Sequence, residues 1–251
     1  MRNYLAAECF KVFRRKYLYV ALAVCVALEG VLLGGTWLSC SWGNTSITFY
    51  STAIMVAMML TFGLYATLVT GDMVFSDQYK HTTLKNEVSY GIPRTRIYLG
   101  KLAVSVLVAV IACVVLVGFY LAGCWILFPH GGEDGQALAL VGYCLAGALP
   151  LWLAAQAVVM ACYFHVRSST MASFLGVGIL AVLPLILQVF GLIFHPAFEV
   201  LRQFTPIVMM DNLKNTAFDS GYIALCWATG LVWFAGATAL GLGLFQKKEI
   251  R

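Results

Sequence analysis

The sequence predicts an all-α membrane protein: one domain over residues 1–251 with six transmembrane helices and both ends in the cytoplasm. Hydrophobic residues make up 61% of the chain and charged residues only 11%. A soluble domain carries about 25% charged residues, so this chain has too little polar material to cover a water-exposed surface. Six long apolar stretches and a one-sided distribution of basic residues complete the prediction.

The apolar stretches define the spans. A helix needs about 20 apolar residues to cross the hydrocarbon core of a lipid bilayer. The stretches that qualify are residues 17–38, 49–71, 102–128, 137–164, 171–194 and 221–245. The third and fourth are long enough to tilt, kink or extend beyond the membrane. Pro150 and Pro184 lie inside spans, where a kink is tolerated if neighbouring groups satisfy the freed carbonyl.

The basic residues predict the orientation, because Lys and Arg accumulate in cytoplasmic loops. Fourteen of the sixteen lie in the N-terminal segment, the loop 72–101, the loop after span four and the C-terminal tail. Only Arg202 and Lys214 fall on the other side. An odd number of spans would destroy this asymmetry.

Charge and cysteine usage exclude other classes. The net charge of +5 does not indicate nucleic acid, because the basic residues flank apolar spans instead of forming a stripe. The eight cysteines form no C-x-x-C pair and lie mostly in apolar runs. We therefore interpret them as small membrane-core residues, not as disulfides or metal ligands.

Residues 1–16 are predicted to form an amphipathic helix at the membrane interface, with its cations toward water and anionic lipid. On a helical wheel, one arc is apolar and consists of Leu5, Cys9, Phe10, Val12 and Phe13. The opposite arc is polar and consists of Asn3, Glu8, Lys11, Arg14 and Arg15. This helix either anchors the topology only or also contacts a cytoplasmic partner.

The loop 72–101 is predicted to be structured. Residues 76–90 form a short polar helix in this interpretation, and Gly91 suits the left-handed position that ends it. Pro93 suits the first turn of a second helix, which leads through residues 94–101 into span three. The alternative is an ordinary solvated, basic inner loop.

This loop resembles the corresponding loop of type-2 ABC exporter permeases. The matching runs are Thr83-Leu84-Lys85-Asn86, Ser89-Tyr90-Gly91-Ile92-Pro93-Arg94 and Arg96-Ile97-Tyr98-Leu99-Gly100-Lys101. The chain departs from the family pattern at Thr82, where the family has Gly, and at Asp77, where it often has Glu. The resemblance therefore does not fix where the polar helix begins. In architecture the similarity extends over the whole chain, including the interfacial helix and the basic tail.

The resemblance implies that the loop is a coupling helix, which docks in a groove of a separate ABC ATPase subunit. The expected coupling residues are Thr82, Thr83, Leu84, Lys85, Asn86, Glu87 and Ser89. The chain contains no G-x-x-x-x-G-K-[ST] phosphate loop. We therefore expect no enzymatic activity and no cofactor in this chain; ATP and Mg bind in the partner. The expected location is the bacterial cytoplasmic membrane.

Two features inside the spans could serve function. Glu29 is an ionisable residue deep in span one, where a charge is costly. It is either protonated or hydrogen-bonded within the fold, or it lines a substrate path. Gly30 with Gly34, and Ala172 with Gly176, are small residues four apart that permit close helix packing. These small residues pack either within the chain or at a subunit interface. The resemblance implies that the chain pairs with a second permease, identical or related, through spans one and five.

The outer segment 195–220 is too polar to span the membrane and too apolar for a free loop. Glu199 and Arg202 can pair at i, i+3 on a short helix, which Pro206 would end. An interfacial or re-entrant hairpin is predicted. In the resembling family this region caps the exit of the translocation path.

The leading hypothesis is therefore an exporter permease for an amphipathic or hydrophobic substrate. In length and in the absence of an extra domain the chain resembles permeases of antimicrobial-peptide resistance, including the lantibiotic immunity group, which implies an antimicrobial peptide as substrate. Other hydrophobic drugs, lipids or ions are the alternative substrates. A membrane-embedded enzyme is the alternative, but the chain lacks H-E-x-x-H and a nucleophilic serine in a G-x-S setting. A secondary transporter would show internal repeats or several buried charges.

Overall fold

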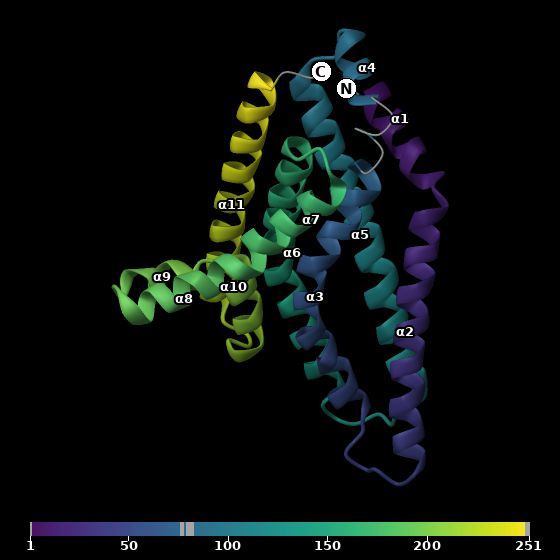
Figure 1. The fold of residues 1–251 in the computed structure, drawn as a ribbon. Coiled ribbons are helices and arrows are strands. Elements are labelled where there is room, and N and C mark those ends of the chain that lie inside the picture. The colour runs from purple at the N-terminus through teal and green to yellow at the C-terminus, as the bar shows by residue number, and fades with distance from the viewer. Residues whose placement is uncertain (1, 76–77, 79–82, 249–251) are drawn as a thin grey trace.

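The computed structural model describes residues 2–75, 78 and 83–248, and every regular element among them is helical. Six long apolar helices are candidate membrane spans: α2 (Lys16–Ser41), α3 (Phe49–Phe75), α5 (Arg94–Leu127), α6 (Asp134–His165), α7 to α8 (Ser169–Ile193) and α11 (Ser220–Lys247). Both chain ends lie at the same end of the bundle (Figure 1). The predicted fold class and number of spans are confirmed.

Helix α6 is the core of the bundle and packs between α3 and α11. Small residues let the neighbouring backbones come close to it. A Cβ on Gly230 of α11 would lie 2.6 Å from the carbonyl carbon of Pro150, so the two helices touch there through backbone. Helix α6 runs through Pro150 without interruption.

Span five is broken in the middle. Helix α7 (Ser169–Val177) passes into a π-helical turn over Gly178–Val182, and α8 (Leu183–Ile193) follows. Pro184 explains the break, because its ring collides with the carbonyl four residues earlier and it donates no hydrogen bond. After the break α8 points sideways out of the bundle (Figure 1). Of the two prolines inside spans, where a kink is tolerated, only Pro184 lies at a break in its helix.

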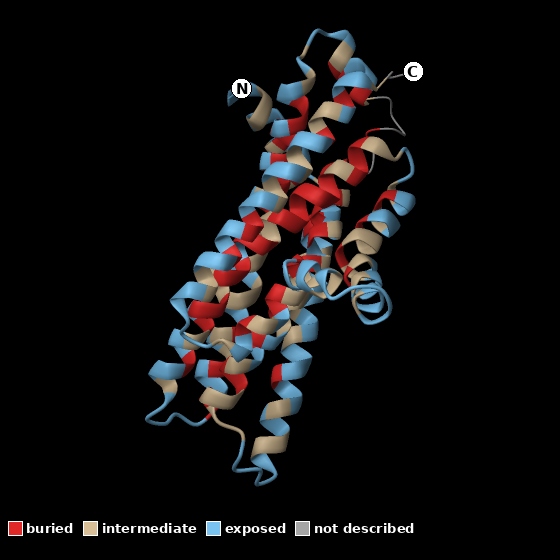
Figure 2. Cartoon of the chain, turned by 90° about the vertical axis from the view of Figure 1, so that its left-hand side faces the viewer, coloured by how far each residue is buried: buried red, intermediate tan, exposed pale blue. Residues whose placement is uncertain are grey.

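The outer segment folds as two short helices, α9 (Ala197–Gln203) and α10 (Pro206–Asn212), followed by a 3-10 turn over Leu213–Asn215. Helix α9 packs back along α8 to form an arm whose surface is largely exposed (Figure 2). The predicted pair is present, with 2.7 Å between the guanidinium of Arg202 and the carboxylate of Glu199. Helix α9 ends at Gln203, before Pro206 as expected, and Pro206 itself begins α10.

Basic side chains cap helix C-termini at the end of the bundle that holds both chain ends, called here the basic end. Arg15 donates to the carbonyl of Met73 near the end of α3 (2.8 Å). Arg94 donates to the carbonyl of Phe245 at the end of α11 (2.8 Å). Lys248 donates to the carbonyl of His165 at the end of α6 (3.0 Å). These cations satisfy orphan carbonyls and oppose the negative ends of the helix dipoles.

Candidate functional site

The short helix α4 (Thr83–Ser89) lies at the basic end, between α3 and α5. It ends where the sequence predicts: Gly91 has a φ of +78°, and its N–H donates to the carbonyl of Val88. Pro93 is the N-cap of α5. Both predicted boundaries are therefore confirmed. Thr82, the first expected coupling residue, lies outside the described residues.

The other expected coupling residues fall on two faces of α4. Leu84 is 1% exposed and Glu87 is 8% exposed, so both face the rest of the chain. Lys85, Asn86 and Ser89 are exposed, and Thr83 is intermediate. Only the exposed face is accessible to another protein. The sequence did not separate the two faces, because the neighbours of α4 lie far away along the chain.

Glu87 joins α4 to two other helices. Its Oε2 accepts a hydrogen bond from the phenol of Tyr4 in α1 (Arg2–Phe13) at 3.0 Å. Its Oε1 lies 3.3 Å from Nζ of Lys11, also in α1, and 3.4 Å from Nζ of Lys101 in α5. One carboxylate therefore connects α1, α4 and the start of α5.

Lys101 is the buried centre of this arrangement. Its side chain is 0% exposed, and its ammonium lies 2.9 Å from Oε2 of Glu8, whose side chain is 2% exposed. Lys11 bonds the other oxygen of Glu8. Glu8, Lys11, Glu87 and Lys101, called here the charge cluster, hold two positive and two negative charges. Such balance is required, since an unpaired buried charge is strongly destabilising.

The environment of the cluster shifts the pKa values of Glu8, Lys11 and Tyr4. Burial alone would raise the pKa of Glu8, but the ammonium of Lys101 and hydrogen bonds from both lysines hold it below the ordinary value. Burial opposes the charge of Lys11, but its bond to Glu8 raises the pKa of Lys11 overall. Burial and the carboxylates of Glu8 and Glu87 raise the pKa of Tyr4, so the phenol keeps the proton that it donates.

Gly100 allows α1 to approach α5. A Cβ at this position would lie 2.5 Å from Cε1 of Tyr4. Because the aromatic ring occupies that space, the phenol of Tyr4 reaches Glu87. A larger residue at position 100 would push α1 away from the cluster.

The position of Glu8 corrects one expectation. The helical wheel placed Glu8 and Arg15 on an arc facing water, but Glu8 is buried and Arg15 turns inward to Met73. Burial of Lys101 explains the difference, because the ammonium needs a carboxylate in the same place. Glu8 and Lys101 are the functional candidates that sequence reasoning missed. A lone acid on a basic helix was the available signal.

Glu29 and its glycine neighbours lie elsewhere, on α2. One carboxylate oxygen of Glu29 is buried and has no hydrogen-bond partner among the described residues. Gly30 and Gly34 are exposed, and a Cβ at either would meet no atom within 4 Å. The structure does not bring these residues together with the charge cluster. They form an open face on a helix that packs mainly against α5.

Ala172 and Gly176 are buried inside the chain instead. A Cβ on Gly176 would lie 2.7 Å from Leu68 of α3 and 3.6 Å from Val159 of α6. Of the two alternatives for this pair, packing within the chain accounts for both residues. Of the four small residues expected at an interface, Gly30 and Gly34 are therefore the two that meet no other part of the described chain.

Comparison with protein families identifies the chain. The model of a family described as ABC-2 family transporter protein matches residues 4–195, which run from α1 to two residues beyond the end of α8. This range contains the whole charge cluster and α4. No curated protein matches the chain.

Proposed function

Since the chain belongs to the ABC-2 family of transporter membrane proteins, we propose that it is the permease of an ATP-driven exporter with an amphipathic or hydrophobic substrate, such as an antimicrobial peptide. Permeases of this family have no ATPase activity and bind no cofactor themselves, and they generally pair with an ATPase subunit. The proposal places ATP and Mg in that subunit, and the chain in the bacterial cytoplasmic membrane with both termini in the cytoplasm.

The coupling mechanism follows from the two faces of α4. The exposed residues Lys85, Asn86 and Ser89 contact the ATPase. The buried residues Leu84 and Glu87 transmit the displacement inward. The single observation that carries this proposal is the contact of Glu87 with Lys101 and α1.

The charge cluster makes α1, α4 and the start of α5 move together. Ion pairs and hydrogen bonds are stronger in a water-poor interior, so separating the helices costs more than displacing them as one unit. Helix α5 continues without a break from Arg94 to Leu127. A push on α4 therefore reaches the membrane interior along α5.

Two permease chains, identical or related, complete the proposed assembly. The open face of α2 at Gly30 and Gly34 supports this, because small residues permit close backbone contact between helices. Glu29, next to this face, would then lie beside a path between the two permeases. There, water or a partner group could satisfy its unbonded oxygen.

Co-purification tests the proposal. The tagged chain is purified from its native host, in wild-type form and as the double variant Lys85→Glu/Asn86→Trp, and mass spectrometry identifies any ABC ATPase that co-purifies. We expect the wild type to retain the ATPase and the variant to lose it. Lys247→Glu/Gln246→Trp alters two exposed residues at the same end and should bind normally. The coupling assignment is wrong if both variants behave alike, and the function is wrong if no ATPase binds the wild type.

A further inference from the structure

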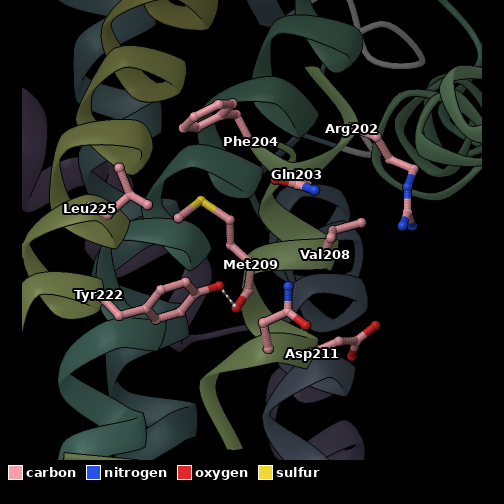
Figure 3. A pocket seen from close by; sticks show the side chains of 9 residues that line it. Arg202, Gln203, Phe204, Val208, Met209, Asp211, Tyr222 and Leu225 are labelled. Carbon is pink, nitrogen blue, oxygen red and sulfur yellow. Dashed lines mark hydrogen bonds between the residues drawn. The ribbon is translucent and has the colours of Figure 1, made fainter. Parts of the chain in front are cut away.

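A cavity of about 310 Å³ opens where the end of α9 and helix α10 meet the first turns of α11 (Figure 3). Its volume is at the lower end of the range for small-molecule sites, about 300–1,000 Å³. Two hydrogen bonds hold this part of the outer segment on α11. Tyr222 donates to the carbonyl of Met209 (3.0 Å), and Trp233 donates to the carbonyl of Phe204 (2.9 Å). The walls of the cavity are therefore formed without a ligand.

The cavity is amphipathic. Phe204, Met209 and Leu225 supply an apolar wall, and the buried Met209 forms its inner part. Arg202, Gln203 and Asp211 lie on the other side (Figure 3). A ligand with one apolar part and one polar end would satisfy both surfaces.

The charges of the rim favour a positive ligand. Arg202 is already neutralised by Glu199, to which it donates three hydrogen bonds of 2.7 to 3.0 Å. Asp211 accepts a hydrogen bond from the hydroxyl of Thr61 in α3 (2.8 Å). Among the described residues, no basic side chain lies within ion-pair distance of this carboxylate. Its negative charge is therefore the uncompensated one at the cavity.

We propose that this cavity binds the protonated amine end of an amphiphile, with the amine on Asp211 and the alkyl part against Phe204, Met209 and Leu225. Two sources have this chemistry: a cationic amphiphile in transit, or a membrane lipid with an amine headgroup. Identifying the ligand as cargo rests on the proposed exporter function. Binding itself requires only this chain.

The test uses the chain alone in phosphatidylcholine nanodiscs, titrated with dodecylammonium or with uncharged dodecanol. Heats of binding are corrected with empty nanodiscs. A hydrogen bond between an ammonium and a carboxylate is stronger than one to a neutral amide, so Asp211→Asn should bind dodecylammonium at least about tenfold more weakly. Glu133→Gln removes an exposed acid elsewhere and should bind as the wild type does. Leu225→Trp places a larger side chain in the apolar side of the cavity and should weaken binding of both compounds.

The outcomes are distinct. The proposal is overturned if Asp211→Asn binds the amine as tightly as the wild type, or if dodecanol binds as tightly as dodecylammonium. Replacing half of the lipid with phosphatidylethanolamine separates the two sources: competition indicates a lipid amine, and unchanged binding indicates a free amphiphile. Failure of binding would leave co-purification of the ATPase unaffected, so the two proposals fail independently.

Discussion

The ammonium of Lys101 lies 2.9 Å from the carboxylate of Glu8, although 93 positions separate the two residues and both side chains are buried. This pair joins α1 to the start of α5. Glu87 then connects α4 to the same ammonium. The connection of α1, α4 and α5 that we propose for transport thus depends on ion pairs. Each residue of the charge cluster can be tested separately.

Removing the cation should destabilise the fold. Lys101→Met leaves two buried carboxylates with Lys11 as their remaining partner in the cluster, and breaking a buried pair typically costs about 3–5 kcal/mol. The double variant Glu8→Gln/Lys101→Met should recover much of that loss. Unfolding can be followed with a thiol-reactive dye, because Cys124, Cys144, Cys162 and Cys226 are buried. Equal stability of Lys101→Met and the wild type would contradict a structural role for the cluster.

The attachment of α1 should depend on pH on the acid side. The pKa of Glu8 is lowered from its ordinary value of 4.5, so its stabilisation is fully present above pH 4.5 and is lost as the pH falls through the lowered value. The pKa of Lys11 is raised from 10.5, so its contribution is present below that pH and is lost only as the pH rises through the raised value. The thermal midpoint measured from pH 3 to 8 should fall at the acid end, and less steeply in Glu8→Gln. If the thermal midpoint falls equally steeply with acid in the wild type and in Glu8→Gln, Glu8 is not the group that stabilises the attachment of α1.

Glu87 should affect coupling more than docking. Because Glu87 faces inward while Lys85 faces outward, Glu87→Ala should still co-purify with the ATPase but transport poorly. Ser89→Ala, a small change on the exposed face, serves as the matched control. The measurement is substrate efflux per ATP hydrolysed in proteoliposomes. A wild-type ratio in Glu87→Ala would show that α4 transmits its movement by another route.

The orientation can be tested by cysteine labelling. Leu84 is buried, so its exposed neighbour Asn86 is the position to use. In a chain whose eight native cysteines are replaced by alanine, Glu133→Cys should react with an impermeant maleimide in intact cells. Asn86→Cys should react only after permeabilisation. Labelling of both positions from the same side would refute the predicted topology.

Glycine substitutions should separate assembly from folding. Gly34→Leu meets open space in the single chain, so it should fold but weaken pairing of permeases. Gly176→Leu would collide with Leu68 and should destabilise the chain itself. Gly118 of α5 also meets open space, so Gly118→Leu is the control for a Gly-to-Leu change outside the proposed interface. The number of permease chains per particle is measured in mild detergent by light scattering. Pairing that survives Gly34→Leu would exclude this face as the interface.

The spans were predictable because lipid imposes a local requirement. Each crossing helix must satisfy its own backbone and present an apolar surface, so its length and composition appear within one stretch of sequence. For that reason the predicted ranges agree closely with α2, α3, α5, α6, α7–α8 and α11. The ends of α4 and α5 were also predictable, since Gly91 and Pro93 restrict the backbone at their own positions.

What only the tertiary structure decided depends on residues that are distant in sequence. The sequence predicted that Glu8 faces water, but in the fold Glu8 is buried and pairs with the buried Lys101. Gly176 and Gly34 have the same local pattern, but only Gly176 meets another helix of the chain. The sequence does not distinguish Asp211 from the other acids; the packing of α10 near α11 places it at a cavity. Burial and charge compensation are properties of what packs against a residue, and local sequence determines the helix without specifying its neighbours.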